Sequence, residues 1–299
     1  MIYINASELA LWTGKNPYEN RALNTLRFWR RYFPENYEKA KREYVEKTGN
    51  EPHEYWSTKE KESNIEKKIK TTFRKRLHTD IQDSQSAEEA MQKKAKLVQE
   101  IVQESQEKGI VLNAEEVEQV KQSVEKNLKT GFGTQKEHTA LDWYEQTYPE
   151  NGKLKRNVSL FQKLFFQVDQ KNSETLQIYL QGKYDGMTED GSKIIEIKHR
   201  MNGCFRKIRD YEQVQVDAYH MLFQVETVEL VECFKKKDGK HEYCRLISHQ
   251  SNERWEEIKE RLVEWIQVLV QLITPGERLR QQVFDFYEHE DCLHDLFFK

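Results

Sequence analysis

Apolar and polar residues alternate through several runs in the second half of the chain. Because successive side chains of a strand point to opposite faces, this period of two predicts β-strands with one buried face. The predicted strands are Asn157–Asp169, Thr175–Tyr184, Lys193–Lys198, Thr227–Lys235 and Glu242–Ile247, the last two joined by the turn Lys237-Asp238-Gly239. So many strands in one stretch predict a central sheet.

Two stretches have the longer apolar period of a helix. Phe205–Phe223 lies between the third and fourth predicted strands, and Asn252–Ile273 follows the last strand and ends before Pro275-Gly276. Strands and helices that follow each other in this way are typical of an α/β fold. We therefore expect a mixed central sheet flanked by helices.

Residues 57–130 differ in composition, being rich in Lys, Glu and Gln with apolar residues at helical spacing. Ser86 and Asn113 are each followed by a glutamate three residues later, which is typical of a helix start. We predict two antiparallel helices, about 87–108 and 114–129, as an insertion at about 57–130 in a single domain of residues 1–299. A solvated decoration is the default interpretation, with an arm or an oligomer contact as the alternatives.

The chain carries a formal net charge of −3, with 37% hydrophobic and 33% charged residues. It has no apolar run of about eighteen residues that could span a membrane, and its start lacks the pattern of a secretory signal. The four cysteines have no CxxC spacing, which is typical of free thiols in a reducing compartment. We expect an intracellular protein without a membrane segment, cytoplasmic, or nuclear if it comes from a eukaryotic host or virus.

The candidate chemistry lies around the second and third predicted strands. Asp185 ends one apolar run, and the next strand places Glu196 and Lys198 on one face while Ile195 and Ile197 point toward a core. If the two strands pair as a hairpin, Asp185 reaches the same face. Two carboxylates beside a lysine form a hard-cation site suited to phosphodiester hydrolysis. The same alternation is also typical of a strand with one solvated face.

Three further segments accompany these residues in order. They are Ser7 with Gly14-Lys15-Asn16-Pro17-Tyr18, then Gly133 with Glu137, Ala140 and Tyr144, and finally Tyr211 with Gln213 and Gln215. Together with the D…ExK pattern of Asp185, Glu196 and Lys198, the chain resembles the YqaJ or lambda-exonuclease-like family of PD-(D/E)xK nucleases. The resemblance is concentrated in residues 1–20 and 130–225, and the motif's proline is replaced by Tyr184.

The resemblance implies a restriction-endonuclease-like fold and Mg²⁺-dependent hydrolysis of DNA, with Mn²⁺ expected to substitute. It implies a 5′→3′ exonuclease acting on double-stranded ends in recombination or repair. The implied partners are DNA ends, a single-strand annealing protein and further copies of the chain. An endonuclease of the same fold and a catalytically dead DNA-binding protein are the alternatives.

The resemblance also implies roles for single residues. The implied metal ligands are Asp185, Glu196, Glu137 and the main-chain carbonyl of Ile197. Lys198 would activate the attacking water or clamp the phosphate, and Gln213 would orient Lys198 or the scissile phosphate. Gln215 would contact the DNA beside it. Ser7 would contact a terminal phosphate. Lys183 would add positive charge there, because no basic residue precedes Ser7.

Several of these residues have competing structural interpretations. Thr134 and Glu137 have the spacing of a capping box, in which Glu137 would bond the start of its own helix. Gln213 and Gln215 would equally fit the surface of an amphipathic helix, and Ser7 would fit a helix N-cap.

Because the whole chain is slightly acidic, DNA binding must rely on local basic clusters. The cluster nearest the predicted site contains Lys198, Arg200, Arg206, Lys207 and Arg209. From it, Arg200, Arg206 and Lys207 are predicted to bind DNA phosphates, contacts that carry little sequence preference. A solvated face is the competing interpretation.

Overall fold

The computed structural model of the chain describes residues 1–50, 96, 98–100, 102–103, 117–118, 121, 137–156, 160–169, 175–200, 202–236, 238–284 and 290–298. The chain divides into two compact units, one of Met1–His53 with Ala140–Lys299 and one of Glu54–Thr139. The helices predicted at 87–108 and 114–129 lie almost wholly outside the described residues, so the insertion stays a prediction.

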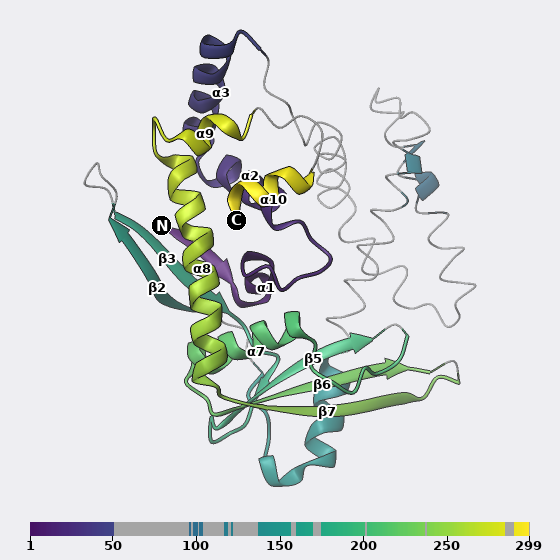
Figure 1. Cartoon of the computed structure of the whole chain (residues 1–299). Coiled ribbons are helices and arrows are strands. Elements are labelled where there is room, and N and C mark those ends of the chain that lie inside the picture. Colours follow the sequence, from purple (N-terminus) through teal and green to yellow (C-terminus); the bar gives the residue numbers. More distant parts are fainter. Residues whose placement is uncertain are drawn as a thin grey trace. The chain divides into compact units, whose positions relative to one another are not determined.

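The first sheet has the strand order β1-β3-β2, where β1 is Ile2–Asn5, β2 is Phe161–Asp169 and β3 is Thr175–Gly182. Strand β1 runs parallel to β3, and β2 runs antiparallel to it (Figure 1). Alternate residues of β3 are buried, as the period of two predicts. The part of the first predicted strand at 157–159 lies outside the described residues.

The second sheet has the strand order β4-β5-β6-β7. Its strands are β4 (Gly186–Met187), β5 (Lys193–Arg200), β6 (Thr227–Lys235) and β7 (His241–His249). Strands β5 and β6 are parallel, and both outer pairings are antiparallel. The fold is therefore mixed α/β, and the prediction of β6 is confirmed at both ends.

The prediction of one central sheet is wrong. The run that ends at Gly182 pairs with β1 and β2, and only Gly186–Met187 pairs with β5. The chain leaves the first sheet after Gly182 and joins the second sheet at Gly186, so the predicted hairpin is reduced to two residues. Asp185 lies at this crossing point.

A hydrophobic core covers one face of the second sheet. The helix at 137–147 contributes Ala140, Leu141 and Tyr144, which pack with Ile195 and Ile197 of β5. This packing confirms that the two isoleucines point into a core. Burying them removes apolar surface from water, at about 25 cal/mol per Å².

Helix α7, Asp210–Phe223, contacts strands of both sheets. It was predicted to begin at Phe205, but Arg206 has a φ of +57°, which no α-helix accommodates. The helix instead begins after Arg209, whose main-chain N–H donates to Glu212 Oε2 at 3.3 Å. Its buried residues include polar ones on several sides, so α7 is an interior element rather than an amphipathic surface helix.

The remaining helices pack around aromatic side chains. They are α1 (Leu9–Trp12), α2 (Arg21–Tyr32), α3 (Pro34–Thr48), α8 (Asn252–Ile273), α9 (Arg278–Gln282) and α10 (Glu290–Phe297), with short 3-10 turns at Ala6–Glu8 and Pro149–Asn151. The prediction of α8 is confirmed at both ends. Its Trp265 stacks on Trp12 at 4.6 Å between ring centroids. No helix within the described residues is long and apolar enough to cross a membrane.

Gly182 of β3 lies close to side chains of α7. A Cβ there would lie 2.8 Å from Leu222 Cδ2 and 3.2 Å from Tyr219 Cε1. Gly182→Ala is therefore expected to lower the free energy of unfolding by about 1–3 kcal/mol, measured by urea denaturation. Gln177→Ala, on the less buried face of β3, is the control and should change it by less than about 0.5 kcal/mol. A Gly182→Ala protein as stable as wild type would contradict this close packing.

Candidate active site

Asp185 is held against β5 by a hydrogen bond to the main chain. The Ile197 N–H donates to Asp185 Oδ2 at 2.7 Å. Because the N–H and C=O of one strand residue point to the same side of the strand, the Ile197 carbonyl faces the edge where Asp185 lies. The structure therefore brings together a carboxylate and a main-chain carbonyl that the sequence analysis assigned to one site.

Glu196 is the buried member of the site, only 6% exposed. Its Oε1 accepts hydrogen bonds from Lys198 Nζ at 2.8 Å and from Gln215 Nε2 at 2.9 Å. Its Oε2 is buried and accepts no hydrogen bond from the described part of the chain. A buried carboxylate oxygen without a donor costs free energy, so this atom is poised to accept a cation or a proton donor.

Lys198 lies on the same face as Glu196, as the strand alternation predicts. Burial alone would lower the pKa of Lys198, but the carboxylates of Glu196, Asp185 and Glu212 outweigh it and raise the pKa above its ordinary value. These carboxylates favour the ammonium form of Lys198 and with it the clamping role.

Gln215 joins the two charged side chains. Its Oε1 accepts from Lys198 Nζ at 2.9 Å, while its Nε2 donates to Glu196 and to the Tyr219 hydroxyl, the latter at 2.8 Å. Tyr219 in turn donates to the main-chain carbonyl of Lys183 at 2.8 Å. Sequence reasoning missed Tyr219, although its position four residues after Gln215 places both on one helix face.

Gln213 does not reach Lys198, contrary to its expected orienting role. Its Nε2 donates to Asp217 Oδ1 at 3.1 Å and to Ser248 Oγ at 2.9 Å. Positions two residues apart on a helix point to opposite sides, so only one of the two glutamines can face β5. The structure gives this place to Gln215.

Oxygen donors of the kind that Mg²⁺ prefers converge here. Asp185, Glu196 and the Ile197 carbonyl supply them. Glu196 Oε2 accepts no hydrogen bond from the described residues and could coordinate a cation. Within the described residues, no three His, Cys, Asp or Glu side chains form a metal cluster. Glu137 begins the helix at 137–147 and belongs to the other compact unit, so its ligand role stays a prediction. Thr134 of the expected capping box lies outside the described residues.

Arg200 is a structural residue rather than an exposed DNA contact. Its guanidinium forms hydrogen bonds with Glu212 at 2.6 and 3.0 Å and with Glu232 at 2.7 Å, and its side chain is 8% exposed. Arg206 pairs with Glu242 at 3.0 Å but is 73% exposed, and Lys207 is exposed. Of the predicted phosphate contacts in this cluster, only Arg206 and Lys207 are accessible.

Ser7 lines a polar pocket of about 490 Å³. The capping position of the turn that begins with Ala6 belongs to Asn5, so Ser7 is not an N-cap. Helix α2 sends Arg27 and Arg31, one helical turn apart, into the same pocket. Glu8 and Glu19 also line this pocket, and Lys183, which does not line it, is exposed.

Comparison with protein-family models gives no match, and comparison with curated proteins gives none either. A phage-related exonuclease from Haemophilus somnus 129PT aligns with 47% of this chain and 70% of its own, at 15% identity and a TM-score of 0.35. The alkaline exonuclease LHK-Exo from Laribacter hongkongensis aligns with 69% of this chain and 90% of its own, at 15% identity and a TM-score of 0.34. Backbones that overlap this little do not place individual residues, so the roles below rest on contacts within this chain.

Removing Arg200 should destabilise the protein. Arg200→Leu leaves the buried Glu212 and Glu232 without their partner and is expected to lower the free energy of unfolding by about 3–5 kcal/mol. Chemical denaturation measures the loss. Arg206→Leu breaks an exposed pair and should leave the free energy of unfolding nearly unchanged. If both variants lost equally little, Arg200 would not be the structural residue described here.

Proposed function

We propose that this protein is a Mg²⁺-dependent DNA nuclease with a restriction-endonuclease-like fold, related to the YqaJ or lambda-exonuclease-like family. One observation carries the proposal: Asp185, Glu196 and Lys198 converge at the edge of β5, and Glu196 Oε2 is buried without a hydrogen-bond donor. Among the buried side-chain atoms of the described residues that have no hydrogen-bond partner, this is the one carboxylate oxygen. A bound cation would satisfy it.

Each group at the site has a part in phosphodiester hydrolysis. Mg²⁺, held by Asp185, Glu196 and the Ile197 carbonyl, would acidify water and offset charge on the phosphate, and Mn²⁺ is expected to substitute. Lys198 is an ammonium group that stabilises charge developing on the phosphate oxygens. Gln215 positions Lys198 and Glu196 relative to each other by bonding both.

We further propose that the protein acts as a 5′→3′ exonuclease on double-stranded ends in recombination or repair. The pocket with Ser7, Arg27 and Arg31 supports this, because a terminal phosphate carries more charge than an internal one. A single-strand annealing protein and further copies of this chain are the partners proposed with it. The competing candidates are an endonuclease of the same fold and a DNA-binding protein that cleaves nothing.

The central test is digestion of end-labelled linear duplex and of closed circular DNA, with Mg²⁺ or EDTA. Wild type should degrade the linear DNA alone, in Mg²⁺ alone. Lys198→Ala should reduce the rate at least about 100-fold, because it removes charge stabilisation from the transition state. Gln215→Ala should reduce it about 10- to 100-fold through lost positioning.

Gln213→Ala is the matched control, since Gln213 lies on the same helix and bonds away from the site. Nicking of the circular DNA would favour the endonuclease. Binding without cleavage of either DNA would favour the non-enzymatic alternative.

The Ser7 pocket predicts a preference for phosphorylated 5′ ends. Wild type should degrade such ends faster than hydroxyl ends, and Arg31→Ala should reduce the ratio of the two rates about tenfold through loss of a charge-assisted contact. Arg30→Ala is the control, because Arg30 lies over the Tyr37 ring at 5.9 Å and does not line the pocket. An unchanged ratio in Arg31→Ala would remove this pocket from end recognition.

A further inference from the structure

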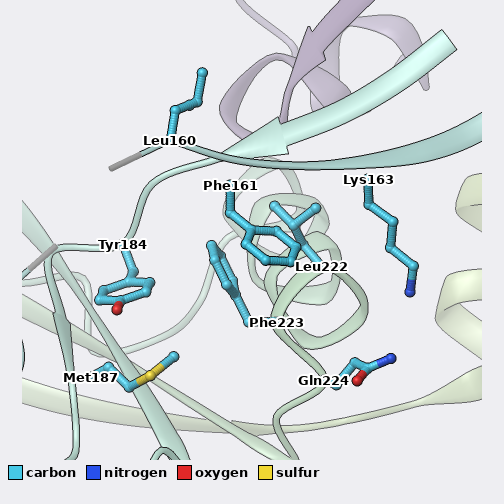
Figure 2. Close-up of a pocket in the computed structure, with 8 residues that line it drawn as sticks. All are labelled: Leu160, Phe161, Lys163, Tyr184, Met187, Leu222, Phe223 and Gln224. Atoms are coloured by element: carbon cyan, nitrogen blue, oxygen red, sulfur yellow. The ribbon is translucent and has the colours of Figure 1, made fainter. Parts of the chain in front are cut away.

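A second pocket lies next to the candidate active site in sequence and in space. It has a volume of about 620 Å³ and is lined by Leu160, Phe161, Lys163, Tyr184, Met187, Leu222, Phe223 and Gln224 (Figure 2). Tyr184 directly precedes Asp185. Met187 belongs to β4, which pairs with the catalytic strand β5.

Aromatic rings form the interior of this pocket. Phe223 lies between two partners, with its ring centroid 5.3 Å from that of Phe161 and 5.2 Å from that of Tyr184. Phe161 is 47% exposed and lies on β2, where none of the residues at 161–168 is fully buried. Exposed apolar groups gathered at one place mark a binding surface more often than scattered ones do.

Polar groups surround the aromatic interior. Lys163, Tyr184 and Gln224 also line the pocket (Figure 2). Gln224 has a φ of +57°, a backbone conformation that is uncommon for residues other than glycine. The pocket therefore offers apolar ring faces with hydrogen-bonding groups and one positive charge at its rim.

Helix α7 connects this pocket to the catalytic carboxylate. Gln215, Tyr219 and Phe223 are spaced four residues apart and so form one stripe on the helix. Gln215 bonds Glu196, Tyr219 bonds the carbonyl of Lys183, and Phe223 contacts Tyr184. Eight residues of helix span about 12 Å, so the pocket lies within the reach of a nucleotide near the scissile phosphate.

We propose that this pocket binds a nucleobase of the strand being cleaved, unstacked from its neighbours, an inference that rests on the proposed nuclease function. A base has two apolar faces and an edge of donors and acceptors, which matches aromatic walls with a polar rim. Lys163 and the exposed Lys183 provide charge complementary to the flanking phosphates, and no carboxylate of the described chain pairs with either lysine. This charge favours a nucleic acid over an apolar segment of a second copy of the chain.

The test is a binding scan in EDTA, where no cleavage is expected. A labelled duplex with a recessed 3′ end carries one abasic site, moved one position at a time along the 5′ strand, and affinity is followed by fluorescence anisotropy. Wild type should lose about tenfold in affinity at one position near the cleavage site. Phe161→Ala should weaken binding of intact DNA about as much and should show no further loss at that position.

Leu164→Ala is the matched control, because Leu164 lies on the same strand, is 45% exposed and does not line the pocket. Phe161→Tyr keeps the ring and should bind like wild type. A scan without a sensitive position, in a protein that still cleaves linear DNA in Mg²⁺, would overturn the pocket and leave the nuclease standing. Absence of cleavage by wild type would contradict the nuclease itself. A dimer that Phe161→Ala converts to a monomer would assign the pocket to a second copy and overturn the proposal.

Discussion

One hydrogen bond, from the Ile197 amide to the Asp185 carboxylate, sets the geometry on which the candidate site depends. Strand β4 covers only two residues of β5, so the next amide along that edge needs another partner. The Asp185 side chain accepts the hydrogen bond from this amide. In a longer β4 strand, a main-chain carbonyl would accept it. A carboxylate is therefore fixed at the sheet edge beside Glu196, and the Ile197 carbonyl faces the same edge.

Several charges around this edge are buried and are held in ion pairs. Glu212 and Glu232 lie 3% and 0% exposed, and Arg200 forms ion pairs with both. Lys198 is left to offset Glu196 and Asp185. Arg200 is therefore buried in ion pairs. This explains why it is not a surface contact, although it belongs to a basic cluster in the sequence. In the proposed function, charge for a phosphate backbone would come from side chains on other elements, such as Lys163 on β2.

Local patterns predicted what depends on local geometry. Strand β6 and helix α8 were placed correctly because each is an unbroken apolar pattern between clear ends. Alternation also placed Glu196 and Lys198 on one face. Alternation does not specify which strands pair, so the division into two sheets could not be foreseen. Gln213 and Gln215 could not be told apart either, because α7 is buried on several sides and has no solvent face to set its rotation.

The same burial gives α7 its connecting role. Burial and the nearby Glu196 charge raise the pKa of Tyr219 well above its ordinary value, so the hydroxyl keeps its proton and donates to the Lys183 carbonyl. This bond fixes the segment that leads into Tyr184 and Asp185. A shift of α7 would therefore move the wall of the aromatic pocket and the edge that carries Asp185 and Glu196 together. Because one rigid stripe of the helix contacts both, occupancy of the pocket and alignment of these two candidate carboxylates are expected to be coupled.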